Sequence, residues 1–321
     1  MQIGSIQLRN PFALAPMAGL SDVPFRTMAW RFGAGYLVSE MVSSQPQLWE
    51  TGKSRLRRIP VAGAKPVAVQ IAGTDPATMA EAAHRHVQEG AEVIDINFGC
   101  PAKKVCRKAA GSALLGDLDL IGRIVAEVVE KVDVPVTVKT RTGLQPGDDI
   151  GVQAGVVAAR SGASMIVMHG RSRACKFAGA IDYAPVARLV EQVDVPVMVN
   201  GDIDSAVAVQ RALDATGAQG VMLGRGAMGQ PWLFAELIGL AVPSLAQRWE
   251  IIAEHLAMMH EFYGERAGVG IGRKHVIAYL QRLGFEKDGF KEFLKLQTAR
   301  QQLAWLSRTA ARMDSAPSRA A

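Results

Sequence analysis

The sequence has 321 residues, of which 49% are hydrophobic and 21% are charged, as is usual for a water-soluble globular protein with a sizeable core. It contains neither about 18 uninterrupted apolar residues nor an amino-terminal basic segment followed by an apolar one, so we expect a cytoplasmic protein without a membrane anchor. Its three cysteines, Cys100, Cys106 and Cys175, have no C-x-x-C spacing, so we expect neither a disulfide framework nor a metal site. The net charge of +6 is compatible with a polyanionic partner.

Eight short runs of β-forming residues alternate with segments of helical spacing. The runs lie at residues 12–15, 36–40, 67–71, 93–97, 134–139, 165–169, 195–200 and 220–223. Helical segments between them include residues 76–88, 120–132, 151–161 and 205–213. This alternation predicts parallel pairing, and eight units predict an α/β fold of the (β/α)8 TIM-barrel class, with an open doubly wound sheet as the alternative. Almost every run ends in polar residues or glycine, as the active face of a barrel does, which favours the barrel.

The run at 93–97 leads directly to a cysteine. Gly99 allows the backbone to turn, so that Cys100 stands in a loop at the carboxyl end of the strand. An isolated cysteine is often only a small buried hydrophobe. Here the loop that follows carries four cationic residues, Lys103, Lys104, Arg107 and Lys108. A thiol beside a basic loop indicates an anionic substrate.

Other strand ends carry groups that bind phosphate or electron-rich rings. Asn200-Gly201-Asp202 and Gly224-Arg225-Gly226 follow the last two runs, where barrels commonly hold a phosphate, although the glycines could merely end the strands. Lys139 and His169 end otherwise apolar runs. An inward-facing lysine requires an anionic or electron-rich partner, whereas a single histidine could belong to the core.

The pattern changes after Trp232, and no further strand is predicted from residue 243 onward. Amphipathic helices are predicted at residues 245–263, 271–283 and 290–308. We therefore expect a barrel domain at 1–242, a helical domain at 243–313 and a disordered tail at 314–321. From Arg248 to the end there are twelve Lys and Arg residues against eight Asp and Glu, which suits either RNA binding or an ordinary solvated bundle.

The order of the motifs resembles that of the tRNA-dihydrouridine synthases. The motifs are Ala15-Pro16-Met17-Ala18-Gly19, Ser39-Glu40-Met41, Gln70-Ile71-Ala72-Gly73, Asn97-x-Gly99-Cys100-Pro101, Lys139-x-Arg141, His169-Gly170-Arg171, Asn200-Gly201-Asp202 and Gly224-Arg225. The resemblance extends from Gly4 to about Trp232 and continues through Arg273-Lys274-His275. Segments 101–105 and 111–115 are similar to the bacterial B-type subgroup.

The resemblance implies a noncovalent FMN in the barrel mouth, NADPH as its reductant, and a uridine of the tRNA D loop as substrate. The residues that match flavin-binding positions of the family are Pro16, Met17, Ala18, Gln70, Lys139 and His169 for the ring, and Asn200, Gly201, Asp202, Gly224 and Arg225 for the phosphate. Contacts with substrate or RNA are expected at Asn97, Lys103, Arg141, Arg171, Arg273 and Lys274. We expect a monomer.

The implied chemistry suits a cysteine at position 100. The C5=C6 bond of uracil is conjugated with the C4 carbonyl, so hydride from the flavin N5 is expected at C6, and the resulting enolate needs a proton at C5. A thiol with an ordinary pKa of about 8.5 is mostly protonated near neutrality and can act as a general acid. Cys100 is therefore the expected proton donor that completes 5,6-dihydrouridine.

Cys106 departs from the family pattern, since a polar residue such as Asn is expected there. Two other functions stay open at this point. A flavin barrel acting on a free pyrimidine, such as a dihydroorotate or dihydropyrimidine dehydrogenase, would share the strand-end chemistry but would not require a basic helical extension. A flavin-containing tRNA chaperone is disfavoured by the presence of both Cys100 and Lys139.

Overall fold

The computed structural model describes residues 1–106 and 110–315, without the side chains of residues 103, 104, 314 and 315. The chain forms two compact units, which are described separately. The first consists of Met1–Arg26 and Ala34–Gly226, and the second of Thr27–Gly33 and the residues from Ala227 onward. The domain boundary expected after residue 242 stays a prediction. The tail expected at 314–321 falls mostly outside the described residues.

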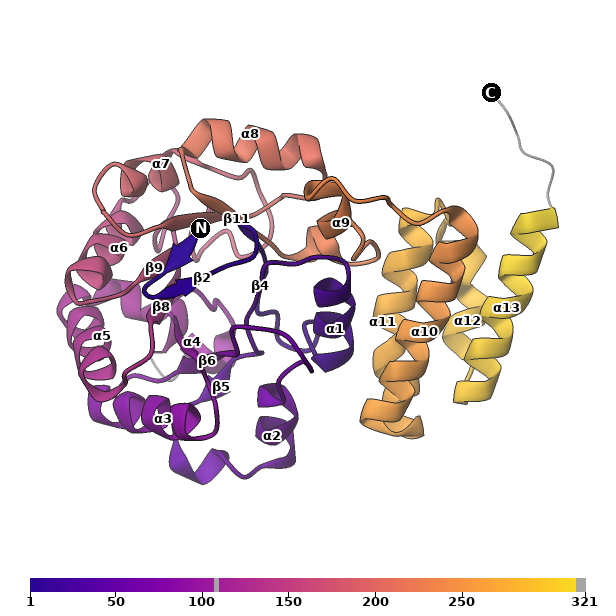
Figure 1. Cartoon of the computed structure of the whole chain (residues 1–321), viewed down its shortest axis with the longest axis horizontal. Coiled ribbons are helices and arrows are strands. Elements are labelled where there is room, and N and C mark those ends of the chain that lie inside the picture. The colour runs from indigo at the N-terminus through magenta and orange to yellow at the C-terminus, as the bar shows by residue number, and fades with distance from the viewer. Residues whose placement is uncertain (107–109, 316–321) are drawn as a thin grey trace. The chain divides into compact units, whose positions relative to one another are not determined.

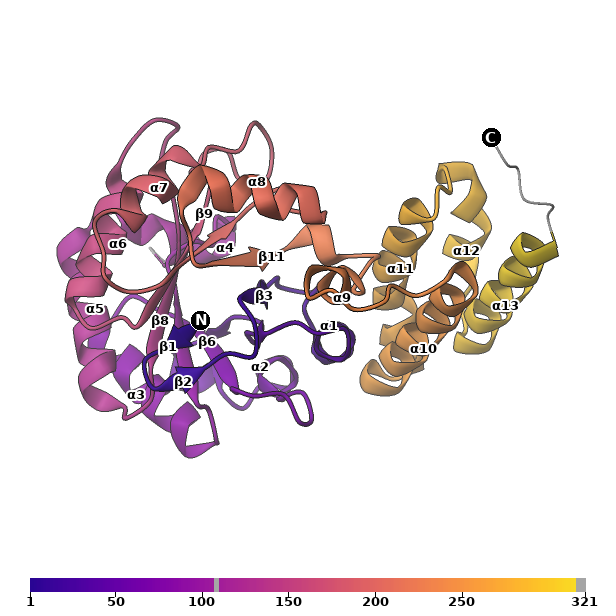
Figure 2. The ribbon, with the colours of Figure 1, turned by 45° about the horizontal axis from the view of Figure 1, so that its top comes forward.

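The first unit is a barrel of parallel strands, as the sequence predicts (Figures 1 and 2). The sheet order is β4-β3-β11-β10-β9-β8-β7-β6-β5, and a parallel bridge between Val38 and Ala68 joins the β4 segment to β6. This bridge closes the ring, so the open-sheet alternative is excluded. The strands are β3 (Phe12–Leu14), β4 (Tyr36–Leu37), β5 (Val42–Ser43), β6 (Ala68–Ala72), β7 (Val93–Asn97), β8 (Val136–Arg141), β9 (Met165–His169), β10 (Val197–Asn200) and β11 (Gly220–Leu223).

The run expected as one strand at 36–40 is split into β4 and β5. Val38 pairs with Ala68 and Val42 with Ile71, so four steps on one side oppose three on the other, which is a β-bulge. At the bulge the Ser39 hydroxyl accepts the Gln70 backbone N–H at 3.0 Å. The Ser39 hydroxyl thus takes the place of a backbone carbonyl as the acceptor for Gln70, and the regular pairing of the strand is interrupted just before Glu40.

Helices surround the strands (Figures 1 and 2), and their ends follow local sequence signals. Asp75, Asp117 and Ser205 each cap a helix by accepting a backbone N–H three residues later. The hairpin β1 (Gln2–Ile3) and β2 (Ile6–Gln7) precedes the barrel. The helical elements of the barrel segment are α1 (Val23–Arg31), η1 (Pro46–Leu48), α2 (Gly52–Arg58), α3 (Pro76–Gln88), α4 (Lys103–Cys106), η2 (Gly111–Gly116), α5 (Leu118–Lys131), α6 (Ile150–Arg160), α7 (Ala184–Val190), α8 (Ala206–Thr216) and η3 (Arg225–Ala227).

Period-two alternation along the strands separates an apolar floor from a polar mouth inside the barrel. Val93 and Val167 belong to the apolar interior cluster, whereas Asp95, Asn97 and His169 follow at intervals of two toward the carboxyl ends. The same inward positions that build the core therefore deliver polar side chains to one end of the barrel.

The second unit packs helices around an aromatic core that includes Trp232, Trp249, Tyr279 and Phe293. Its elements are α9 (Leu233–Leu237), α10 (Leu245–Tyr263), α11 (Glu265–Arg282), η4 (Lys287–Phe290), α12 (Lys291–Lys295) and α13 (Ala299–Ser315). None of the helices within the described ranges is long and apolar enough to cross a membrane.

The single helix expected at 290–308 is wrong, because the chain breaks between α12 and α13. The Gln301 N–H donates to Thr298 Oγ1 at 3.2 Å, and Gln301 Oε1 accepts the Thr298 N–H at 3.2 Å. This capping box starts a new helix at Ala299. The Arg273 guanidinium donates to the Leu296 carbonyl at 2.7 Å, which satisfies a backbone acceptor at the break.

Candidate active site

Polar side chains from neighbouring strands converge at the carboxyl end of the barrel. Asn97 at the end of β7 pairs in register with Lys139 of β8, and His169 of β9 pairs with Asn200 of β10. Gln70 of β6 contacts Asn97 directly. The structure thus brings together five of the residues expected at the mouth.

Lys139 is the only one of these five with a strongly basic side chain. Its Nζ donates to Asn200 Oδ1 at 2.8 Å, and Asn200 Nδ2 in turn donates to the Met222 carbonyl at 2.7 Å. Burial, helped by the nearby Arg141 charge and opposed by Asp95, lowers the pKa of Lys139 to about 7. The amine therefore takes or gives up its proton near neutrality, according to what lies beside it.

His169 is held neutral. Burial, followed by the positive charges of Lys139 and Arg141, lowers the pKa of His169 to about 2. Its Nδ1 is buried and has no hydrogen-bond partner among the residues that the structure describes. This ring nitrogen is therefore available for a hydrogen bond from a ligand or a water molecule.

The Cys100 loop is held by backbone hydrogen bonds. Asn97 Oδ1 accepts the N–H of Cys100 at 2.9 Å and that of Gly99 at 3.2 Å. The Cys100 carbonyl accepts both the hydroxyl and the N–H of Ser112, at 2.9 and 3.1 Å. Burial raises the pKa of the half-buried Cys100 thiol, so it stays protonated at neutral pH.

Cys106, the second thiol, lies in α4 and contacts the backbone of the first. Its Sγ is 3.5 Å from the Cys100 carbonyl oxygen and 3.7 Å from Ser112 Oγ. Lys103 starts α4, but its side chain and residues 107–109 lie outside the described part of the chain. The Cys106 sulfur therefore lies against the backbone of the Cys100 loop.

Arg141 and Arg171 are buried and engaged within the protein. Arg141 Nε donates to the Gly99 carbonyl at 2.6 Å, and one of its terminal nitrogens donates to the Lys176 carbonyl at 2.8 Å. Arg171 donates to the Gly179 carbonyl and makes a bidentate ion pair with Asp202. Each guanidinium therefore ties the loop after β9 to another strand end.

The backbone after β10 approaches its neighbours closely. Gly201 has a φ of +123°, and a Cβ there would lie 2.4 Å from Ile181 Cδ1. Asp202 has a φ of +48°, and the Arg171 hydrogen bond lowers the pKa of its carboxyl group. Arg225 extends beside this turn with 55% of its side chain exposed, and its guanidinium lies 5.5 Å from the centre of the Phe177 ring.

The first strand end is held through Glu40. The backbone N–H of Met17 donates to Ser21 Oγ at 2.7 Å, and the N–H of Gly19 donates to the Glu40 carboxylate. Arg57 of α2 lies 3.6 Å from the same carboxylate. Pro16, Met17 and Ala18 therefore stand in a loop of fixed shape whose side chains are partly or fully exposed.

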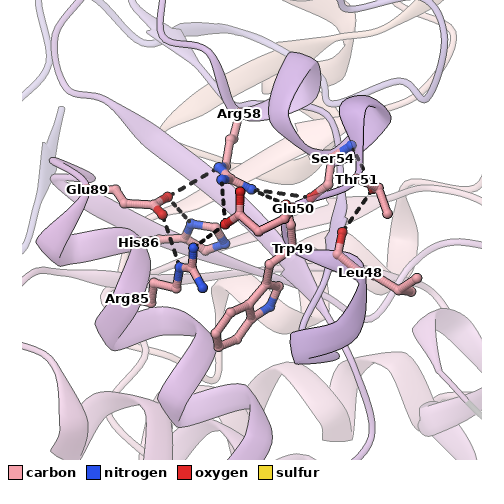
Figure 3. Close-up of polar contacts among 9 residues, drawn as sticks. All are labelled: Leu48, Trp49, Glu50, Thr51, Ser54, Arg58, Arg85, His86 and Glu89. Atoms are coloured by element: carbon pink, nitrogen blue, oxygen red, sulfur yellow. Dashed lines mark hydrogen bonds and ion pairs between the residues drawn. The ribbon is translucent and has the colours of Figure 1, made fainter.

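Helix α2, which supplies Arg57, is itself anchored to α3 by shared ion pairs (Figure 3). Glu50 contacts both Arg58 and Arg85, and Glu89 lies 3.2 Å from Arg58 and 3.1 Å from Arg85. The Arg85 guanidinium also lies 4.5 Å from the centre of the Trp49 ring. Two acids that each serve two arginines fix the segment that follows β5.

Comparison with known proteins identifies the family. Residues 13–315 match the family described as Dihydrouridine synthase (Dus). The chain belongs to the dihydrouridine synthase family. It is 46% identical over 311 residues to tRNA-dihydrouridine synthase B of Pseudomonas aeruginosa, with 95% of this chain and 94% of that protein covered. It is 45% identical to the protein of the same name from Salmonella typhimurium and 44% identical to that from Escherichia coli K12, each over 310 residues that cover 94% of this chain and 97% of theirs. The chain is therefore an enzyme of the oxidoreductase class.

The polar groups at the mouth of this dihydrouridine synthase are of the kinds that would hold a flat polar ring and a phosphate, which are the two ends of FMN. Lys139 and the buried His169 Nδ1 offer hydrogen bonds to a ring. A Cβ added at Gly224 would come no closer than 3.7 Å to Met17 Sδ, so backbone is accessible there, and the exposed Arg225 follows. In the described ranges no three His, Cys, Asp or Glu side chains gather as they would around a metal ion.

Two expected RNA contacts of this dihydrouridine synthase lie on α11, and the structure distinguishes them. Lys274 is exposed, whereas Arg273 is half-buried and donates to the Leu296 carbonyl. Lys274 is therefore accessible to a phosphate, and Arg273 supports the fold of the helical unit.

Sequence reasoning missed several residues that shape the site of this dihydrouridine synthase. Asp95 was not assigned a role, although its position two residues before Asn97 placed it on the same inward face. Ser112 holds the Cys100 carbonyl, and Glu40 holds Gly19, across 12 and 21 residues. No local pattern marks such long-range pairs.

Proposed function

We propose that this enzyme catalyses the FMN-dependent, NADPH-driven reduction of uridine to 5,6-dihydrouridine in the D loop of tRNA. Family membership supports the reaction, and the names of the relatives support tRNA as the substrate. The single observation that carries the mechanism is the Cys100 loop, which the Asn97 side chain holds in the same mouth as Lys139 and His169 and where burial raises the pKa of the thiol.

Bound FMN would supply the hydride that adds at C6 of the uracil ring. Lys139, His169 and Gln70 would hold its ring beside Pro16-Met17-Ala18, and a lysine whose pKa is about 7 gains a proton readily when negative charge develops nearby. The backbone at Asn200, Gly201 and Gly224 would hold the phosphate together with the Arg225 guanidinium. The Asp202 carboxylate already accepts hydrogen bonds from Arg171, so Asp202 would contact the phosphate through its backbone.

Cys100 would donate its proton to C5 of the substrate. The raised pKa suits this role, because a thiol that kept no proton would have nothing to give. Asn97 would orient the thiol through the backbone, and Arg141 would hold the same loop from the other side through the Gly99 carbonyl. This assigns Arg141 and Arg171 to the architecture of the mouth, since their donors already serve carbonyl and carboxylate oxygens.

The tRNA would be bound by cationic side chains, including Lys274 and the basic residues that follow Cys100. Moving a uridine out of its stack costs on the order of a few kcal/mol, and less in a loop than in a duplex. Phosphate contacts offset this cost and make binding salt-dependent. We propose that the enzyme acts as a cytoplasmic monomer.

The test is direct. The purified protein should be yellow, heat should release FMN, and unmodified tRNA incubated with NADPH should gain dihydrouridine. Release of FAD, or no flavin under reconstituting conditions, would contradict the cofactor assignment. Turnover of free uracil or orotate without any reaction on tRNA would instead establish a free-pyrimidine reductase.

A further inference from the structure

A buried line of hydrogen bonds, here called the Asp95 relay, runs through the barrel interior to the Cys100 loop. It consists of the side chains of Thr137, Asp95, Gln70 and Asn97, which are 0 to 8% exposed. The Thr137 hydroxyl donates to Asp95 Oδ1 at 2.6 Å, Gln70 Nε2 donates to Asp95 Oδ2 at 2.6 Å, and Asn97 Nδ2 donates to Gln70 Oε1 at 2.8 Å. Asn97 Oδ1 then accepts the backbone N–H groups of Gly99 and Cys100.

The direction of this relay follows from its base. An ionised carboxylate can only accept hydrogen bonds, so Gln70 must present its amide nitrogen to Asp95. The Gln70 side-chain oxygen then faces Asn97, whose amide nitrogen must donate to it. The oxygen of Asn97 is left for the two backbone N–H groups. The acceptor-only carboxylate at one end and the donor-only N–H groups at the other therefore require the same orientation of both amides.

Asp95 accepts a hydrogen bond at each of its two oxygens, as an ionised carboxylate does. Burial raises the pKa of Asp95 to about 6, and the hydrogen bonds from Thr137 and Gln70 and the charge of Lys139 act against this rise. Tyr36 of β4 also faces Asp95, and burial keeps that phenol in its neutral form. A carboxylate this far inside the barrel is costly unless it is fully hydrogen-bonded, and the relay supplies those bonds.

We propose that Asp95 is a positioning residue: through Gln70 and Asn97 it holds the backbone of Cys100, and so fixes where the thiol stands in the mouth. The proposal rests on the proposed function in one respect, because it treats Cys100 as the proton donor. It goes beyond that function in naming a group that touches neither substrate nor cofactor. The same relay orients Gln70, one of the residues expected beside the flavin ring.

Two substitutions at position 95 distinguish an orienting role of the Asp95 carboxylate from a role in packing alone. Asp95→Ala removes the acceptor for Gln70. Asp95→Asn can still offer an oxygen to Gln70 if Thr137 turns its hydroxyl to accept from the new amide nitrogen. Asparagine should therefore largely rescue what alanine loses. Thr140→Val is the matched control, because it removes a buried side-chain hydrogen bond from the same strand as Thr137 and leaves every link of the relay intact.

The experiment uses the FMN-loaded full chain and two readouts. In the first, iodoacetamide labelling of Cys100 is followed by peptide mass spectrometry; we expect several-fold faster labelling in Asp95→Ala and wild-type rates in Asp95→Asn and Thr140→Val. In the second, prereduced enzyme is mixed with unmodified tRNA; the single-turnover rate should fall by roughly 10- to 100-fold in Asp95→Ala, the scale on which misplacing a reacting group acts. In a Cys100→Ala background, Asp95→Ala should cause no further loss.

Unchanged labelling and an unchanged single-turnover rate in folded Asp95→Ala would overturn the proposal. An equal loss in Thr140→Val would also overturn it, because the effect would then belong to packing around β8. If Asp95→Ala does not fold, Asn97→Ala cuts the last link at the mouth and must show the same faster labelling. Labelling does not depend on the chemistry assigned to Cys100, so a fully active Cys100→Ala enzyme would refute the proposed function and leave the relay testable.

Discussion

Arg141 donates its Nε–H to the carbonyl oxygen of Gly99 at 2.6 Å, one residue before Cys100. The same guanidinium lies 2.8 Å from the carbonyl of Lys176 in the loop after β9. A planar fork with several donors can hold two loops at once, whereas a lysine ammonium on a flexible stem cannot reproduce that geometry.

Arg141→Lys should therefore slow the uridine half-reaction by about 10-fold or more, as expected when a reacting group is misplaced. Binding of tRNA should keep its wild-type affinity and salt slope, because the arginine does not serve a phosphate. Single-turnover rates and filter binding at several salt concentrations measure the two effects. A smaller salt dependence of tRNA binding in Arg141→Lys than in wild type would instead mean that Arg141 contacts RNA phosphates.

Cys100→Ala should bind FMN and tRNA and still accept hydride from NADPH, yet form dihydrouridine roughly 10²- to 10⁴-fold more slowly, the usual effect of losing a positioned general acid. Cys106→Ala is the matched control, since the Cys106 sulfur contacts the Cys100 carbonyl oxygen, and the rate of this variant should change little. Oxidation of prereduced flavin by tRNA isolates this step. Loss of activity in Cys106→Ala alone would mean that the acid is the other thiol.

Lys139→Met should weaken FMN retention or slow flavin reduction, because the side chain could no longer favour negative charge on the ring. Fluorescence of released flavin and stopped-flow reduction by NADPH report the two quantities. Wild-type retention together with a wild-type reduction rate would remove Lys139 from the flavin site.

The flavin-free protein gives a second, independent measure of Lys139. Its pKa is about 7 when folded and near 10.5 when unfolded, so between these values the unfolded chain binds a proton that the folded chain does not. The resulting loss of stability is complete below pH 7 and disappears above about pH 10.5. Lys139→Met should thus raise the melting temperature of flavin-free protein at pH 7 and lose that advantage as the pH approaches 10.

Lys274→Ala should raise the apparent KM for tRNA and flatten the salt dependence of binding, with NADPH oxidation by bound flavin nearly unchanged. Arg273→Ala should instead lower the melting temperature, because it leaves the Leu296 carbonyl without its donor. An identical salt slope in Lys274→Ala and wild type would place Lys274 on an ordinary solvated face.

Acid should destabilise the helical unit through two buried histidines. The rings of His255 and His275 lie 4.9 Å apart; burial holds the pKa of His255 well below its ordinary value and lowers that of His275 to about 4. As the pH falls below about 6.5, the unfolded chain takes up protons that the folded chain refuses, so stability declines until about pH 4. His275→Gln should therefore lose less of its melting temperature between pH 7.5 and 5 than wild type does. His84→Gln, at a less buried histidine of α3, should behave like wild type.

The sequence predicted the parts of this fold whose causes are local. β7, β9 and β11 lie where their apolar runs predicted them, and polar strand ends such as Lys139 and His169 lie on neighbouring strands, as expected for a barrel. The capping box of Thr298 and Gln301 is an equally local signal, and it marks the start of α13 inside the segment expected as one helix. In contrast, the bulge at Glu40 depends on a hydrogen bond from Gln70 to Ser39 across 31 residues, which no neighbouring sequence reveals.

The roles of charged residues at the mouth were harder to predict. Arginines at strand ends suggested RNA contacts by residue type alone. The acceptors of Arg141 and Arg171 are mainly backbone carbonyls in the loop after β9, and carbonyls have no sequence signature. Asp95 lay on a predicted inward face, but its partners became evident only when the strands were in register.

The closure of the barrel has a consequence for how it opens. A single bridge pair, Val38 with Ala68, joins the β4 segment to β6, whereas β8 and β9 share five pairs along their length. With the two pairs that β5 makes, three pairs join this segment to β6, so local opening breaks fewer pairs here than between β8 and β9. In deuterated solvent the amide of Ser39, which bonds to the Ala68 carbonyl, should exchange its proton well before the amides between β8 and β9. The barrel would thus open locally at this seam, next to the turn that carries Glu40, more readily than between β8 and β9.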